Sequence, residues 1–235
     1  MSIFDYHLFV NLLKFCDRSH LFPLLLTSKR IKDLTWRHLI DFLNINLNEI
    51  LYKILYNKCE EDIFETFESL LKDSKVDPSY QRNIFIKSAC TIGHIEIVRL
   101  LLRNHRVNPA DERNISIKYA SLNGRTEIVR LLLQDPRVDP SSGCNNAIIN
   151  SSACGYLEIT KLLLQDSRVD PSVRNNEAIR LALKNGHTSI VKLLLKDNRI
   201  DKKTKEFCRK KYKIKNSDLH KLKYESSLEQ SDQDD

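Results

Sequence analysis

The chain has 235 residues, of which 41% are hydrophobic and 29% charged, and its formal net charge is +7. This composition allows a stacked apolar core with a solvated exterior. The longest apolar stretch, Leu21 to Leu26, contains Pro23 and is too short to span a membrane, and the first residues show no export pattern. We therefore expect a monomeric protein of the cytoplasm or the nucleus.

Residues 1–45 carry apolar side chains at helical spacing in three groups, which predicts a small segment of three helices. The groups are Phe4, Leu8, Phe9, Leu12 and Phe15, then Leu21, Leu24 and Leu25, then Ile31, Leu34, Trp36 and Leu39. One interpretation is that this segment covers the end of the repeats that follow, because the terminal units of a repeat array must present a polar outer face.

The order of features in the same segment resembles an F-box. The resemblance is carried by Leu12-Leu13, by Leu24-Leu25 and by the Ser-Lys-Arg-aliphatic step that ends at Ile31, although Ile3-Phe4-Asp5 stands where that family has Leu-Pro. In that family the module docks on the linker subunit of a cullin-type ubiquitin ligase. The docking residues that the resemblance implies here are Phe9, Leu12, Leu24 and Leu25. The cap and the F-box-like module remain alternatives.

Residues 46–76 fit a 31-residue register in outline and predict a divergent first repeat, with helices near Asn48 to Asn57 and Asp62 to Lys72. Four closer copies follow, at 77–107, 108–138, 139–169 and 170–200. Their register is marked by residues 31 positions apart, namely Gly93, Gly124, Gly155 and Gly186, and Pro78, Pro109, Pro140 and Pro171. A fixed period of this length predicts a solenoid in which each unit buries its apolar face against its neighbours.

The sequence of each copy predicts two short helices and a loop. In the second copy, Asn114 is expected to cap the first helix by accepting hydrogen bonds from its free amides. The Asn123-Gly124 step ends that helix in a left-handed turn, since glycine has no penalty for positive φ. A second helix is predicted over Thr126 to Gln134, and Pro140 forces the chain to leave it as an extended turn.

This pattern resembles the ankyrin repeat, in a short form of the kind seen in amoebae and large DNA viruses. The blocks that carry the resemblance are Gly93-His94-Ile95-Glu96-Ile97-Val98-Arg99-Leu100-Leu101-Leu102 and Gly186-His187-Thr188-Ser189-Ile190-Val191-Lys192-Leu193-Leu194-Leu195. The Thr-Pro-Leu-His opening of the family is absent. The resemblance implies an all-α, ankyrin-type solenoid of helix pairs that binds proteins and is not an enzyme.

The segment after Asp201 is strongly basic and then acidic. Residues 201–216 predict a terminal cap, with a closing helix at Glu206 to Lys215 whose Phe207 and Cys208 cover the preceding leucines. The acidic end, 217–235, is expected to be disordered. The basic residues are Arg209, Lys210, Lys211, Lys213 and Lys215; a solvated face is one interpretation, and nuclear import or nucleic-acid binding is the weaker alternative.

No catalytic constellation is found in the sequence. The six cysteines form no Cys-x-x-Cys pair and have no histidine at ligand spacing, so we expect neither a metal nor a cofactor. Four of the five glycines are repeat turns, which leaves no glycine-rich phosphate loop. His94 and His187 follow repeat glycines, where a structural role is expected.

Positions that change between copies are free to serve a partner, while constant positions serve the stack. The variable positions lie in the loops and first helices, which together form the concave face of ankyrin arrays. The predicted partner-binding residues are Tyr80, Arg82, Lys87, Asp111, Arg113, Lys118, Leu122, Ile149, Arg174, Arg180 and Lys184. Tyrosine, arginine and exposed aliphatic residues are the types that anchor protein interfaces. The sequence therefore favours a protein-binding scaffold, with a ubiquitin-ligase adaptor as the alternative.

Overall fold

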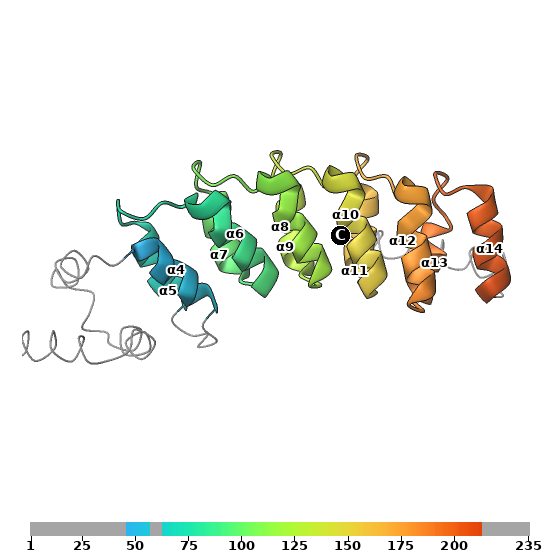
Figure 1. Ribbon diagram of the computed structural model, residues 1–235, viewed down its shortest axis with the longest axis horizontal. Coiled ribbons are helices and arrows are strands. Elements are labelled where there is room, and N and C mark those ends of the chain that lie inside the picture. The colour runs from blue at the N-terminus through green and yellow to red at the C-terminus, as the bar shows by residue number, and fades with distance from the viewer. Residues whose placement is uncertain (1–45, 57–62, 213–235) are drawn as a thin grey trace, which may run out of the picture. The chain divides into compact units, whose positions relative to one another are not determined.

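The computed structural model describes residues 46–56 and 63–212, and within these ranges all regular elements are α-helices (Figure 1). The predicted all-α, ankyrin-type solenoid of helix pairs is confirmed. The predicted N-terminal three-helix segment with its F-box docking residues, and the acidic end of the chain, lie outside the described residues. A boundary between two compact units follows Asp77.

The first unit contributes one helix pair to the described residues, α4 (Leu47–Tyr56) and α5 (Ile63–Leu71). Leu51, Leu55 and Phe67 are fully buried. The pair lies where the sequence predicted a divergent repeat.

In its described part, residues 78–212, the second unit contains four helix pairs and a final helix. Its elements are α6 (Tyr80–Ile92), α7 (Ile95–Leu102), α8 (Asp111–Leu122), α9 (Thr126–Gln134), α10 (Ser142–Cys154), α11 (Leu157–Gln165), α12 (Val173–Lys184), α13 (Thr188–Leu194) and α14 (Lys202–Tyr212). We call α6, α8, α10 and α12 the first helices, and α7, α9, α11 and α13 the second helices. Successive pairs lie side by side in chain order (Figure 1), and neighbouring first helices contact one another more extensively than neighbouring second helices do.

The core is built from residues that recur in the 31-residue register. The fully or almost fully buried positions include Ile86, Ile117, Ile148 and Ile179 on the first helices, and Leu101, Leu132, Leu163 and Leu194 on the second helices. Burial of an aliphatic side chain of this size contributes about 1.5–3 kcal/mol. Every copy therefore adds the same apolar contacts, which is why the period propagates as a stack.

Each first helix begins with a left-handed turn that the sequence did not predict. Three consecutive residues have φ between 45° and 65° in every copy, namely 81–83, 112–114, 143–145 and 174–176. The third residue is always the repeat asparagine. The predicted capping role for this asparagine is wrong in the first three copies, because its side-chain oxygen accepts the backbone N–H of the next copy. The backbone N–H groups of Asn108, Asp139 and Asp170 are the donors. They bond to the side-chain oxygens of Asn83, Asn114 and Asn145, respectively, each at 2.8 Å.

The glycine turns that end the first helices are confirmed, and they have a second function. Gly124 and Gly155 have φ of 70° and 85°. A methyl group added at Gly124 would lie 2.7 Å from the ring of Tyr156, and one at Gly155 would lie 2.6 Å from the ring of His187. Glycine thus permits both the left-handed turn and the close approach of a flat side chain from the next copy.

The final helix α14 begins earlier than predicted and covers less of the preceding repeat than expected. Asp201 caps it by accepting the Thr204 N–H at 2.8 Å. Cys208 is buried as expected, but Phe207 is 59% exposed, so the prediction that it covers the preceding leucines is wrong. Consecutive helical residues point about 100° apart, so the helix buries Cys208 without burying Phe207.

Candidate protein-interaction surface

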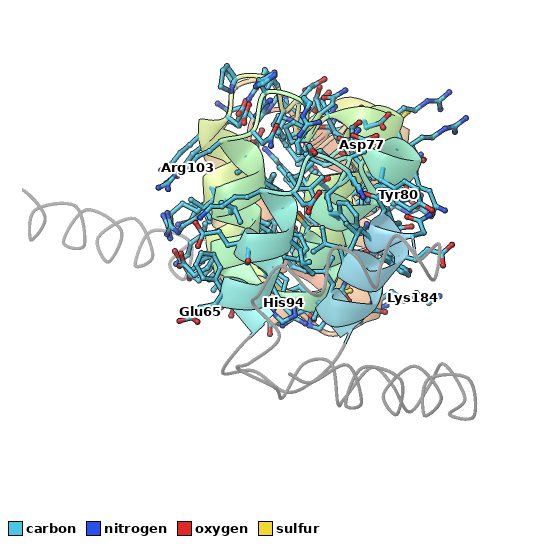
Figure 2. All side chains as sticks on the ribbon, turned by 90° about the vertical axis from the view of Figure 1, so that its left-hand side faces the viewer. Glu65, Asp77, Tyr80, His94, Arg103 and Lys184 are labelled. Atoms are coloured by element: carbon cyan, nitrogen blue, oxygen red, sulfur yellow. The ribbon has the colours of Figure 1, made fainter. Side chains whose placement is uncertain are left out.

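The variable positions of the first helices lie on one side of the second unit. They form two rows, one helical turn apart. We use the name first-helix face for these two rows together with the left-handed turns. The rows are Lys87, Lys118, Ile149 and Arg180, and Thr91, Leu122, Ala153 and Lys184. Tyr80 and Lys184, from opposite ends of the first-helix series, lie on the same side in Figure 2, and Arg103, which follows α7, lies on the other.

Most of the predicted partner-binding residues are exposed on this face. Arg82, Arg113, Arg174, Arg180 and Lys184 are exposed, and Lys118 is half-buried. Leu122 is 39% exposed. The face therefore offers guanidinium groups, amines and one aliphatic side chain, the groups that protein interfaces use.

Two of the predicted residues offer little or no surface. Ile149 is only 4% exposed and belongs to the core between the first helices. Lys87 is 7% exposed, and its amine lies 3.0 Å from the carboxylate of Glu112 in the left-handed turn of the next copy. Both side chains therefore stabilise the contact between copies.

Tyr80 and Asp111 combine a surface position with a structural role. The ring of Tyr80 stacks on Phe85 with 6.1 Å between centroids. Asp111 accepts a hydrogen bond from the side-chain amide of Asn83 at 2.9 Å. That hydrogen bond is the main cause of the lowered pKa of Asp111, so its carboxylate is charged and already partnered.

A periodic contact that the sequence interpretation missed joins the second-helix ends of successive copies. Asp166 and Arg168 form a two-pronged ion pair with distances of 2.9 and 2.7 Å, and Nη1 of Arg168 also donates to the carbonyl oxygen of Val138 at 2.9 Å. Equivalent pairs are Asp135 with Arg137 and Asp197 with Arg199. The signal was available, because Asp-x-Arg recurs at the 31-residue interval.

These Asp–Arg pairs shift the pKa values of their aspartates. The hydrogen bond from Arg168 holds the pKa of Asp166 below its usual value, and the same cause lowers the pKa of Asp135 and Asp197. Each arginine is consequently engaged with its aspartate and with the preceding copy. We infer no partner-binding role for these cations.

The basic helix α14 presents part of the predicted basic cluster. Lys210 and Lys211 are exposed and Arg209 is half-buried, while Lys213 and Lys215 lie outside the described residues. The predicted structural role of His187 agrees with its Nε2 atom lying 3.0 Å from the carbonyl oxygen of Ala153 in the preceding copy.

Features of other kinds of site are not seen in the part of the chain that the structure describes. No group of three or more histidine, cysteine or acidic side chains is arranged to hold a metal ion there. None of the helices in residues 46–56 and 63–212 is both long and apolar enough to cross a membrane. Cys90 is fully buried, and burial raises the pKa of its thiol.

The comparison with protein families agrees with this geometry. Residues 51–144 match the family model for ankyrin repeats, in three copies. The described fold is an ankyrin-type helical solenoid. Ankyrin repeats imply a role in protein–protein interaction. The match does not include residues 1–45, so the F-box-like interpretation stays a prediction, and no curated protein matches the chain.

Proposed function

We propose that this chain is a non-catalytic scaffold whose first-helix face binds a protein partner. The observation that carries the proposal is a difference between the two sides of the helix pairs. On the second helices of the first three copies the surface charges repeat as Glu96 with Arg99, Glu127 with Arg130, and Glu158 with Lys161, and the fourth copy has Ser189 with Lys192. On the first-helix face the residues at equivalent positions differ in charge, size and polarity.

The constant side has a local explanation, because its ion pairs are three residues apart on single helices and stabilise those helices by a few tenths of a kcal/mol each. The variable side has no such explanation. Lysine, leucine, alanine and threonine share equivalent positions on the first helices without a common contact in the stack. Greater variation on one side is expected when that side fits a partner of irregular surface.

The packing of the helices favours the same side. Neighbouring first helices contact one another more than neighbouring second helices do. Closer approach on one side of a stack favours curvature towards that side, which supports the proposal that the first-helix face is the concave one. A concave surface buries more of a partner than a flat one, so we expect contacts from several copies at once.

Affinity capture with a matched pair of full-length variants tests this proposal. The test variant carries Leu122→Ala and Arg180→Ala on the first-helix face, and the control carries Arg99→Ala and Arg130→Ala on the second helices. We expect proteins captured from a cell lysate by the unmodified chain to be lost with the test variant and kept with the control. Equal capture by both variants, with both folded by circular dichroism, would contradict the proposal.

A further inference from the structure

The charges on the two sides of the second unit are balanced in different ways. On the second helices, Arg99 lies 3.5 Å from Glu96, Arg130 lies 3.5 Å from Glu127, and Lys161 lies 2.8 Å from Glu158. Each of these cations has an acid on its own helix. This local balance holds for α7, α9 and α11, whereas α13 carries Lys192 and no acid.

On the first-helix face the acids are already engaged. Glu112 pairs with the buried Lys87, Asp111 accepts from Asn83, and Glu177 lies 3.4 Å from Arg174. Within residues 78–212, no acid of this face is left to balance its remaining cations.

Those cations have no carboxylate partner within the described residues. Arg113, Arg180 and Lys184 are exposed and make no ion pair there, and the amine of Lys118 lies over the ring of Tyr119 at 5.7 Å from its centroid. An exposed guanidinium group without a carboxylate is available for two-pronged recognition of one. The first-helix face thus has an unbalanced positive charge.

Apart from Arg82 at the start of α6, whose charge acts on Asp111, the unbalanced cations form two groups. One group is Arg113 and Lys118 on α8, and the other is Arg180 and Lys184 on α12. Arg180 and Lys184 are four residues apart and so lie on the same face of their helix. The intervening helix α10 (Ser142–Cys154) carries no charged residue, and the exposed Leu122 lies on α8 beside it.

The spacing of the groups limits what fits them. Packed helices lie about 8–10 Å apart, so two steps from α8 to α12 span roughly 16–20 Å. An extended chain covers at most about 3.3–3.6 Å per residue. About five or six residues therefore separate the points at which an extended peptide meets the two groups.

We propose that the partner presents an extended acidic segment to the first-helix face, with two groups of Asp or Glu about five or six residues apart and uncharged residues between them. One acidic group binds Arg113 and Lys118, and the other binds Arg180 and Lys184. The uncharged middle crosses α10 beside Leu122. This inference rests on the proposed function, because it names the chemistry of the partner at the same face.

The chain itself contains one acidic segment, since residues 225–235 hold five acids and no lysine or arginine. We assign the face to a partner segment, because the five acids at Glu225, Glu229, Asp232, Asp234 and Asp235 do not form two groups with an uncharged middle. A full-length variant with these five residues changed to Gln or Asn distinguishes the two occupants.

Selection from a random 12-residue peptide library on the full-length chain is the experiment. We expect enrichment of peptides with two acidic groups at the stated separation. The affinity of a selected, fluorescently labelled peptide is then measured by fluorescence polarisation. Because the contacts are between exposed charges, we also expect binding to weaken severalfold between 50 and 300 mM NaCl.

Two full-length variants with the same change in net charge locate the contact. Arg180→Glu with Lys184→Glu should weaken the binding of the selected peptide at least tenfold. Arg99→Glu with Arg130→Glu should change it less than threefold. Equal losses in the two variants would overturn the proposal, because they would indicate a general effect of net charge.

The remaining outcomes are also decisive. Enrichment of neutral or basic peptides that still lose binding with the first-helix variant would overturn the acidic partner and leave the proposed function standing. Acidic peptides that are enriched only when residues 225–235 are neutralised would assign the face to the chain's own end and overturn its assignment to a partner. Absence of any enrichment with either chain would contradict the acidic segment.

Discussion

The side-chain oxygen of Asn114 accepts the backbone N–H of Asp139, 25 residues further along the chain, at 2.8 Å. Asn114 is buried and has φ of 57°, so it completes the left-handed turn of its own copy and holds the first turn of the next. The stack is therefore joined by polar contacts in register with its apolar core.

Asn114→Ala should be strongly destabilising. The substitution leaves the N–H of Asp139 without its partner and places a residue with a Cβ and no compensating side-chain bond in the left-handed region. We expect a loss of about 2–4 kcal/mol in the free energy of unfolding, measured with urea. Asn114→Gly keeps the backbone conformation and should lose only about 1–2 kcal/mol. Equal stability of the two variants would contradict a contribution from the left-handed turn.

A substitution at the middle residue of the same turn should stabilise the protein. Arg113 is exposed, has φ of 60° and makes no ion pair within the described residues, so Arg113→Gly relieves the strain of a left-handed residue. We expect a gain of about 0.5–1 kcal/mol in thermal or urea unfolding.

The complementary control is Gly143→Ala in the third copy. Gly143 has φ of 65°, and an added Cβ would lie 2.8 Å from Nδ2 of Asn146. We expect this variant to lose about 1–2 kcal/mol. A gain in stability from Gly143→Ala would contradict the turn geometry.

Two buried hydroxyl groups should be replaceable with a gain in stability. The hydroxyls of Ser121 and Ser152 are buried and have no hydrogen-bond partner among the described residues. Cys90 and Leu183 occupy the equivalent positions in the other copies, so the site accepts apolar side chains. Ser121→Ala should raise the free energy of unfolding by about 0.5–1 kcal/mol, because an unpaired polar group is removed from the core.

Ser151→Ala provides the matched control for that prediction. The Ser151 hydroxyl lies 3.0 Å from that of Thr160 and 3.2 Å from the carbonyl oxygen of Ile148. Its removal leaves the buried Thr160 hydroxyl with fewer partners, and we expect a loss of about 1–2 kcal/mol. If both alanine variants gained stability, the hydrogen bond between Ser151 and Thr160 would have no net value.

The Asp–Arg pairs predict how stability depends on pH. The pKa of Asp166 is lower in the folded chain than in the unfolded chain, where it is about 3.9. The stabilisation is therefore complete above the unfolded pKa and is lost as the pH falls below about 4 towards the folded pKa. Asp135 and Asp197 should titrate in the same direction.

Arg168→Met tests this coupling by urea unfolding at pH 7 and pH 3. We expect a loss of about 1–3 kcal/mol at pH 7, since the variant lacks the ion pair and the bond to the Val138 carbonyl. The difference from the unmodified chain should shrink at pH 3, where the aspartate is protonated in the unfolded state. A difference that is the same at both values would contradict a role for the aspartate charge.

The sequence predicted the helix pairs well because the apolar core repeats with the same interval. The bounds of α9 agree residue for residue with the prediction, since Gly124 and the leucine stripe mark both ends of the pattern. The left-handed turns were not predicted, because residues such as Glu112 and Arg113 rarely adopt positive φ. Only the surrounding stack holds them in that conformation.

The candidate surface was predicted less completely, for a related reason. Variation between copies identified exposed positions such as Arg180 and Lys184. It did not show that Lys87 is covered by Glu112 or that Ile149 is enclosed between first helices, because those contacts depend on residues of neighbouring copies. The Asp-x-Arg period was visible in the sequence and would have identified the pairs around Arg168.

Site-specific photo-crosslinking tests the central claim, that partners bind the first-helix face, most directly. A photoreactive phenylalanine analogue is introduced at Leu122, which is 39% exposed on α8, or at the exposed Arg130 on α9. We expect a crosslink to the captured partner from position 122 and none from position 130. A crosslink from position 130 alone would place the partner on the opposite side of the helix pairs and contradict the account.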